Sequence, residues 1–131
     1  MKAEITALCD AASTSSGKLN ILGAFDLIKV EKMPAIHPIA ALALRLKASK
    51  DEFGTYKFDV KLIDPNEIEI LKPVDDEITF KSEDLFFIQN IVIWLQNLKL
   101  ESIGLYKFII NIDGKEITNC EFRVSSIDNY K

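Results

Sequence analysis

The sequence predicts an all-β protein, and three observations lead to that fold class. Segments of alternating apolar and polar residues recur along the chain, and turn residues separate them at short intervals. Two segments are near copies, GTYKFDVKLID from Gly54 and GLYKFIINID from Gly104, as corresponding strand-turn-strand units would be. We therefore predict a single antiparallel β-sandwich of about seven to nine strands over residues 1–131, immunoglobulin-like in general architecture.

The chain begins with a predicted hairpin. Residues 3–11 alternate with Cys9 in the apolar frame, and residues 19–30 alternate again after the turn sequence STSSGK at 13–18. Gly23 lies inside the second of these segments, which indicates a bulge or a close approach of two chain segments. The two segments should therefore pair as the first hairpin.

A crossing loop and a third strand are predicted to follow. Residues 31–38 contain two prolines, which lack the N–H group that a sheet needs, so this segment should be a loop. In residues 39–48 the leucines alternate with Ala43, Arg45 and Lys47. This order predicts a strand with one face toward the core and one toward water, although the composition of the segment also suits a helix.

The middle of the chain contains a strand, a turn and an acidic segment. Residues 56–63 alternate clearly, and the DPNE sequence at 64–67 places proline at the favoured second position of a turn. Residues 67–71 are predicted to return as a short strand. The acidic segment 73–84 is predicted to be an irregular, mobile loop with at most a few extended residues around Phe80.

The last third of the chain predicts a very apolar strand and a closing hairpin. Residues 85–98, LFFIQNIVIWLQNL, are apolar on every face, so a helix competes with the strand that their aromatic and β-branched content favours. Residues 104–112 and 115–124 alternate around Asp113-Gly114, a strong hairpin turn. Cys120 is expected to share the inner face of the last strand.

Charge and hydropathy limit the classes of partner. Sixteen basic against twenty acidic residues give a net charge of −4, which disfavours binding to nucleic acid. Acidic residues interrupt the first residues where a signal peptide needs an apolar run, and no segment has the roughly 18 apolar residues of a membrane span. We therefore expect no membrane partner and a cytoplasmic protein.

The residues capable of catalysis or metal binding form no known pattern. His37 is the only histidine, and we expect it to fix the loop between Ile36 and Pro38 rather than to act as a base. Cys9 and Cys120 lack metal-ligand spacing, and in a reducing compartment two thiols are favoured over a disulfide. These observations predict no catalytic residue, no metal site, no cofactor and no enzymatic activity.

Four carboxylates are candidates for a calcium site. The residues occur in predicted loops or turns, and loop carboxylates at one end of a sandwich can hold calcium; they are Asp64, Asp75, Asp76 and Asp113. Their spacing does not match a calcium loop, and solvated turn residues explain them.

Aromatic residues divide into two predicted roles. Tyr56 and Tyr106 each begin a strand after glycine, as in a tyrosine corner, in which the hydroxyl bonds to a backbone group. Trp94, Phe87 and Leu95 should fill the core between the sheets. If that strand is apolar on both faces, however, a loop or another subunit must cover its outer face.

The main functional hypothesis is therefore a non-catalytic protein-interaction or self-associating scaffold module. Its partner would be another protein or a second copy of the chain, and His37, Phe87, Trp94 and Leu95 are the residues that we would probe first. Edge strands also offer backbone groups to such a partner. The alternative is a small-molecule or carbohydrate-binding β-sandwich, which would need exposed aromatic rings beside polar groups.

Most of the chain resembles a bacterial family of small, uncharacterised all-β proteins that open with a strand ending in a Leu-Cys-Asp-like triplet. The residues that carry the resemblance are Leu8, Cys9 and Asp10, then Gly17, Lys18, Leu19, Asn20, Gly23, Phe25, Asp26, the loop from Pro34 to Pro38 with His37, Arg45, Gly104, Tyr106, Asp113 and Gly114. These are mostly turn and core residues. The resemblance therefore implies an all-β fold of unknown function and assigns no catalytic residue.

Overall fold

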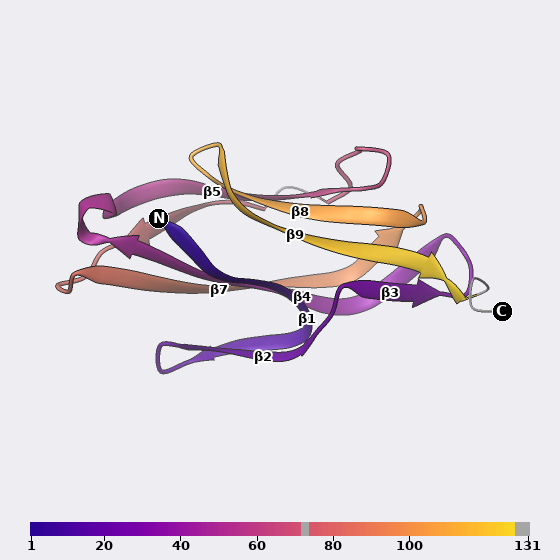
Figure 1. The fold of residues 1–131 in the computed structure, drawn as a ribbon, viewed down its shortest axis with the longest axis horizontal. Coiled ribbons are helices and arrows are strands. Elements are labelled where there is room, and N and C mark those ends of the chain that lie inside the picture. The colour runs from indigo at the N-terminus through magenta and orange to yellow at the C-terminus, as the bar shows by residue number, and fades with distance from the viewer. Residues whose placement is uncertain (72–73, 128–131) are drawn as a thin grey trace.

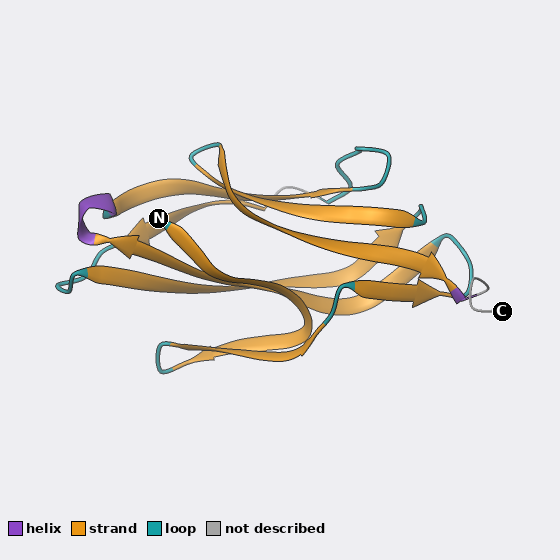
Figure 2. Cartoon of the chain, in the orientation of Figure 1, coloured by secondary structure: helices purple, strands orange, loops and turns teal. Residues whose placement is uncertain are grey.

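The computed structural model describes residues 1–71 and 74–127, which form two β-sheets packed face to face (Figures 1 and 2). The four-stranded sheet has the order β2-β1-β4-β7, and the five-stranded sheet has the order β3-β9-β8-β5-β6. The predicted β-sandwich is thus confirmed. The elements are β1 (Lys2–Ser15), β2 (Lys18–Ala24), β3 (Leu27–Val30), β4 (Ala35–Ser49), the short 3-10 helix η1 (Lys50–Glu52), β5 (Gly54–Ile63), β6 (Val74–Phe80), β7 (Phe86–Leu100), β8 (Gly104–Ile112) and β9 (Lys115–Ser126).

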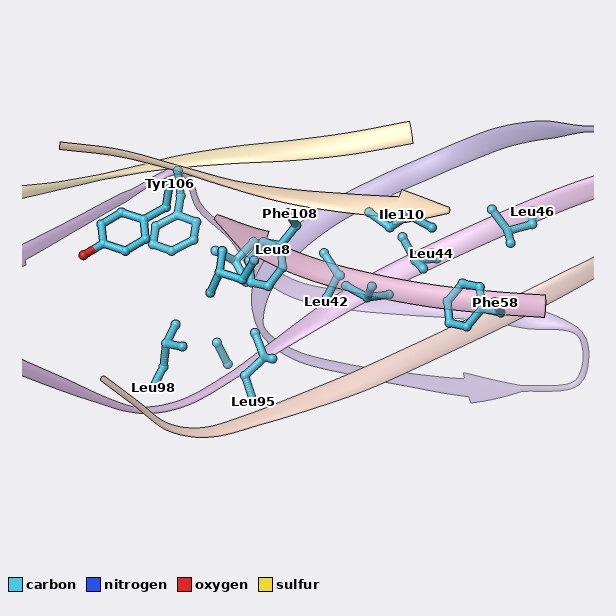
Figure 3. Packing of buried hydrophobic residues seen from close by; sticks show 14 of the residues in the cluster. Leu8, Leu42, Leu44, Leu46, Phe58, Leu95, Leu98, Tyr106, Phe108 and Ile110 are labelled. Carbon is cyan, nitrogen blue, oxygen red and sulfur yellow. The ribbon is translucent and has the colours of Figure 1, made fainter. Parts of the chain in front are cut away.

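The main hydrophobic core lies between the two sheets (Figure 3). Strand β4 contributes Leu42, Leu44 and Leu46, all 0% exposed, because alternate residues of a strand point to the same face. Aromatic side chains from the opposite sheet pack against them, with the rings of Phe108 and Phe122 5.7 Å apart. Burying each such side chain contributes about 1.5–3 kcal/mol.

Strand β1 belongs to two layers of the molecule. Its first half pairs with β4, as far as Cys9↔Ala41, and its second half pairs with β2, from Ala11↔Leu22 onward. Between the two halves the strand bends back, so that the hairpin of β1 and β2 lies on the opposite side of β4 and β7 from β8 and β9 (Figure 1). The predicted first hairpin is confirmed, but it forms a third layer rather than extending a flat sheet.

A second, smaller core holds this hairpin against the outer face of the four-stranded sheet. Ala41 and Ala43 of β4 are both 0% exposed and cluster with Cys9 and Ala12, and the side chains of Leu19, Ile21 and Val92 pack around them. At the hairpin tip, the carbonyl of Gly17 accepts hydrogen bonds from Arg45 Nη1 at 3.3 Å and from Asn90 Nδ2 at 3.1 Å. The prediction that the Ala43 side of this strand faces water was therefore wrong, because the hairpin covers it.

The segment predicted as one strand over 19–30 is divided between the two sheets. Strand β2 ends at Ala24, and β3 pairs in parallel with β9 from Leu27↔Arg123 to Val30↔Ser126. At the crossing the N–H of Phe25 donates to Leu8 O at 2.9 Å. The chain thus changes sheets at residues 25 and 26, and this change produces the one parallel pairing among the described strands. The alternation of apolar and polar residues alone does not reveal the change of sheet.

The acidic segment was predicted wrongly in its first half. Residues 74–80 form β6, which pairs with β5 from Val60↔Val74 to Gly54↔Phe80. The carboxylates are tolerated because β6 is an edge strand, where side chains reach water. Residues 67–71 are not a strand, since they contribute only an isolated bridge, Ile63↔Glu69. Residues 72–73 lie outside the described part of the chain.

The structure decides between strand and helix for segment 85–98, and it corrects the predicted start of the strand at 39–48. The apolar segment 85–98 is a strand, as its composition favoured, and β7 pairs with β4 along nearly its whole length. Strand β4 begins at Ala35, earlier than predicted, so His37 and Pro38 belong to a strand rather than to a crossing loop. The pairing passes from His37↔Leu98 to Ile39↔Gln96, and Pro38, which cannot donate, is left out of it.

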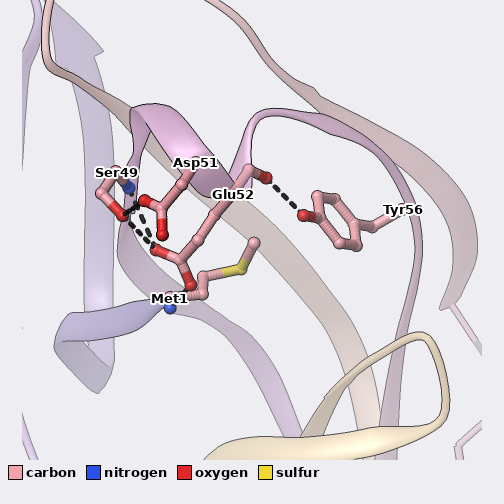
Figure 4. Close-up of polar contacts among 5 residues, drawn as sticks. All are labelled: Met1, Ser49, Asp51, Glu52 and Tyr56. Atoms are coloured by element: carbon pink, nitrogen blue, oxygen red, sulfur yellow. Dashed lines mark hydrogen bonds and ion pairs between the residues drawn. The ribbon is translucent and has the colours of Figure 1, made fainter.

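Both predicted tyrosine corners are present. The Tyr106 hydroxyl donates to Ser102 O at 2.7 Å and accepts from Ser102 N at 3.3 Å. The Tyr56 hydroxyl donates to Glu52 O in η1 (Figure 4). In the same turn the Ser49 hydroxyl donates to Asp51 Oδ1 at 2.6 Å, and Glu52 forms an ion pair with the Met1 amino group. Each tyrosine thus fixes the connection that precedes its strand.

We expect Tyr106→Phe to lower the free energy of unfolding by about 1–3 kcal/mol, because it leaves the Ser102 carbonyl without its donor. Tyr106 is 0% exposed, so water cannot replace the lost hydroxyl. Tyr56→Phe is the control, and it should cost less because Tyr56 is only partly buried. Urea unfolding of both variants measures the difference, and an equal loss would contradict the distinction.

Gly23→Ala should destabilise the β1–β2 hairpin, because the side chain of Asp10 would have to move to make room for the added carbon. Gly23 has φ +69°, and a Cβ there would lie 2.4 Å from Asp10 Oδ2 at the bend of β1. Gly17 has a similar φ of +72° but no atom within 4 Å of the added carbon. Gly17→Ala should therefore cost only the backbone strain of about 1–2 kcal/mol, and thermal unfolding should show a larger loss for Gly23→Ala.

Candidate functional site

Strand β7 is a long sheet edge whose first 13 residues carry no charge. It is 15 residues long, pairs with β4 on one side, and has no described strand on its other side. From Phe86 to Leu98 it contains no Asp, Glu, Lys or Arg. The other edge strands differ, since β6 carries three consecutive carboxylates and β2 and β3 are 7 and 4 residues long. Because proteins usually protect their sheet edges with charge or by shortness, this edge requires an explanation.

The backbone of β7 presents alternate residues to the free side. The N–H of Lys50 donates to Leu85 O at 2.9 Å, so Leu85 bonds toward β4. The next carbonyl, that of Phe86, points the other way and accepts from Ser82 Oγ at 3.0 Å. By the alternation of an antiparallel pair, the N–H and C=O groups of Ile88, Asn90 and Val92 point away from β4. These groups can pair with an added strand.

Large apolar side chains flank this edge on the outer face of the sheet. Trp94 is 47% exposed and Phe86 46% exposed, and Ile39 of β4 is 50% exposed. The Lys47 ammonium lies 4.4 Å from the centroid of the Phe86 ring, a cation–π contact. The β1–β2 hairpin covers the outer face near Val92 but leaves Trp94 half exposed, so the face beside the edge remains accessible.

A groove of about 280 Å³ lies between β7 and β6, the two strands that form this side of the sandwich. Its floor is apolar, with Phe58, Ile78, Ile91 and Ile93 among the lining side chains. Gln89 from β7 and the acidic residues Asp76 and Glu77 from β6 also line it, and the side chain of Asp76 lies on the inner side of its sheet, like that of its partner Phe58. An extended peptide along the β7 edge would therefore meet both apolar contacts and negative charge.

The four residues proposed as probes do not form one surface. Trp94 faces outward beside the free edge, contrary to the prediction that it fills the core. Leu95 is 4% exposed and belongs to the core, as predicted, so it is not available to a partner. Phe87 packs edge-on against Phe80 with centroids 6.3 Å apart, and His37 lies 5.7 Å from the Phe25 ring on another part of β4. Among the four, only Trp94 is exposed beside the candidate site.

Three of the four carboxylates considered for calcium accept hydrogen bonds from backbone N–H groups. Asp64 Oδ1 accepts from Asn66 N at 2.9 Å and from Ile68 N at 2.8 Å, which closes the predicted turn. Asp113 Oδ1 accepts from Lys57 N at 2.8 Å. Asp75 and Asp76 lie on strand β6, not in a loop. Within residues 1–71 and 74–127, no group of three histidine, cysteine or acidic residues is placed to hold a metal ion.

Comparison with known families identifies the group to which this chain belongs. A family model described as "Family of unknown function (DUF6941)" matches residues 4–125. The chain is a member of DUF6941. The expected membership of a small all-β family of unknown function is thus confirmed. No curated protein matches the DUF6941 chain.

Similar solved structures share only the fold with the DUF6941 chain. One is a Pseudomonas fluorescens alkylpurine DNA glycosylase, AlkC, bound to DNA containing an abasic site analog, with 10% identity, a TM-score of 0.52, and coverage of 95% of this chain and 30% of that one. Another is a β-glucosidase from Listeria innocua in complex with isofagomine, also at 10% identity and a TM-score of 0.52, covering 92% of this chain and 16% of that one. The chain spans less than a third of either enzyme. Identity this low shows a common sandwich fold and nothing about activity.

The two cysteines of the DUF6941 chain are free thiols. Cys9 is 0% exposed and donates to Ala41 O at 3.3 Å in the small core under the hairpin. Burial raises the pKa of the Cys9 thiol, and the charge of Asp10 raises it further. Burial also raises the pKa of Cys120. Neither thiol is therefore activated as a nucleophile. In addition, the described residues include no helix of sufficient length and hydrophobicity to cross a membrane.

Stability should fall at alkaline pH, partly through Cys9. Because the folded-state pKa is raised, the unfolded chain loses this proton near the ordinary value of 9.0 while the folded chain keeps it. The contribution is therefore complete below that value and is lost as the pH rises. We expect the stability difference between wild type and Cys9→Ala to be constant below about pH 8 and to decrease above 9, by at most about 1.4 kcal/mol per pH unit. Urea unfolding across this range tests it, and a constant difference would contradict it.

Proposed function

We propose that this DUF6941 protein is a non-catalytic, cytoplasmic protein-binding module that accepts an extended segment of a partner along the free edge of β7. The observation that carries the proposal is the absence of charge from Phe86 to Leu98 on a 15-residue edge strand. An added strand would bond to the outward groups of Ile88, Asn90 and Val92. Such strand addition uses main-chain hydrogen bonds for affinity and side-chain pockets for specificity.

The surroundings of the edge support a protein segment as the ligand. Each new backbone hydrogen bond contributes about 0.5–1.5 kcal/mol, so a short strand needs additional apolar burial to bind tightly. Trp94 and Phe86 offer that burial on the outer face, and Ile91 and Ile93 offer it on the groove side. Tryptophan is also among the residues that contribute most to protein interfaces. Nucleic acid is disfavoured by the net charge of −4 and by the acidic residues of β6 beside the groove.

Carbohydrate binding is the second candidate, because one observation favours it. Trp94 is exposed on a sheet face, and the amide side chain of Gln96 lies two residues further along the same strand and is also exposed. An aromatic ring beside a polar group can bind a sugar ring. Titration with mono- and oligosaccharides, followed by Trp94 fluorescence, separates this function from protein binding. A saturable change that Trp94→Ala abolishes would favour it.

If a partner binds by adding a strand to β7, its affinity should depend on the outward backbone groups of that strand. A library of linear peptides selected on the wild-type protein should yield binders, and their affinity should fall at least tenfold on Ile88→Pro, because proline removes an outward N–H and blocks the edge. On binding, the amides of Ile88, Asn90 and Val92 should become protected from hydrogen exchange. The amides of Gln89 and Ile91, already bonded to β4, should change little.

The controls separate loss of binding from loss of folding. Ile88→Val keeps the N–H and nearly the same side chain, so it should bind as the wild type does. Circular dichroism and the melting temperature report whether Ile88→Pro remains folded. Binders with equal affinity for both variants, or protection confined to strands other than β7, would show that the edge is not the binding site.

A further inference from the structure

Asp76 occupies an unusual position on β6. Its pairing partner on β5 is Phe58, which is 4% exposed and faces the core, so Asp76 lies on the inner side of its sheet. Its neighbours in the same frame, Ile78 and Phe80, are buried at 7% and 0% exposure. Asp76 itself is exposed because β6 is an edge strand. The carboxylate therefore lies at the mouth of the groove between β6 and β7.

No cation of the described residues forms an ion pair with Asp76. Its Oδ1 accepts the backbone N–H of Glu77 at 2.8 Å, and the ion pairs of the described chain involve other carboxylates. Lys57 of β5 lies opposite Glu77, and residues 57 and 77 share the outer face of the sheet. Asp75 also lies on that outer face, opposite Asp59. A negative charge on the inner face beside an apolar groove is thus left for a ligand to neutralise.

We propose that the segment accepted by β7 alternates apolar with basic residues, and that a lysine or arginine on its inner face pairs with Asp76. This inference rests on the proposed function and adds the chemistry of the partner. An added strand would lie about 4.8 Å outside β7, and its inner side chains would point toward the edge of the other sheet, about 10 Å away. A long basic side chain can cross most of that distance. The apolar residues that alternate with it point to the outer face, where Trp94 and Phe86 are exposed.

A second copy of the chain fits this edge poorly. If β7 paired with β7 of another copy, the two five-stranded sheets would lie side by side at their β6 edges. Each β6 would then bring the carboxylates of Asp75, Asp76 and Glu77 toward the same carboxylates of its neighbour. Like charges at an interface oppose association. Charge complementarity therefore favours a basic segment over self-association.

Two nine-residue probe peptides test the charge preference, one alternating valine with lysine and one alternating valine with glutamate. We expect the lysine peptide to bind the intact protein at least tenfold more tightly than the glutamate peptide. Asp76→Asn should weaken the lysine peptide about tenfold. Asp75→Asn is the matched control, with the same charge change on the next residue of the same strand but on the outer face, and it should change binding less than twofold.

Each outcome decides between the proposals. Equal losses from Asp75→Asn and Asp76→Asn would show a general charge effect and overturn the role of Asp76. Equal binding of both peptides, with loss on Ile88→Pro, would overturn the basic partner while retaining strand addition to β7. Binding of neither peptide, together with no binders from the linear library, would overturn both. Concentration-dependent dimerisation abolished by Ile88→Pro would instead assign the edge to a second copy.

Discussion

The burial of β4 on both faces is the constraint on which the arrangement of the other strands depends. Its inner face carries leucines, which reach across to the second sheet, and its outer face carries Ala41 and Ala43, both 0% exposed. Small side chains on the outer face let the β1–β2 hairpin approach closely, as larger ones would not. Close packing in this second layer is as sensitive to side-chain volume as in the main core.

The bend of β1 is the structural consequence of that constraint. To pair with β4 and then cover it, β1 must leave the sheet after Cys9 and turn back, and Gly23 makes room for Asp10 at this bend. The hairpin is then held at its tip by Arg45 and Asn90. The hairpin covers the part of the outer face around Ala41, Ala43 and Val92. The hairpin therefore leaves two surfaces open, the free edge of β7 and the exposed ring of Trp94.

Local sequence patterns predicted the features that depend on neighbouring residues. Alternation identified most strands, Asp113-Gly114 identified the closing hairpin, and glycine before tyrosine identified both tyrosine corners. These patterns gave the wrong prediction where the position of a segment in the tertiary structure decides its conformation. Acidic residues disfavour strands in general, yet β6 is stable at an edge where they reach water. The apolar frame of 19–30 continues through the change of sheet, so alternation could not show that β2 and β3 part.

The candidate site was predictable only in part, and for a physical reason. The uncharged run in 85–98 correctly indicated a strand, but sequence could not show that the chain's own hairpin covers part of the outer face of that sheet. Trp94 and Leu95 are adjacent, so one must face outward, and only the pairing Ala41↔Trp94 shows which one does. Asp76 became interpretable only once β6 was known to be a strand, because its register with Phe58 places it on the inner face.

The inward carboxylate of Asp76 would also explain how the edge of β7 stays accessible without pairing with unrelated strands. Inward-pointing charges on edge strands oppose association with other sheet edges, since pairing would bury the charge without a partner. Asp76 lies on the neighbouring strand β6 rather than on β7, so it would apply this cost to any segment that covers the groove without supplying a cation. A basic side chain removes the cost. Asp76 would thus disfavour neutral strands and favour basic ones. The specificity would come from the difference between the two binding free energies and not only from tight binding of the basic strand.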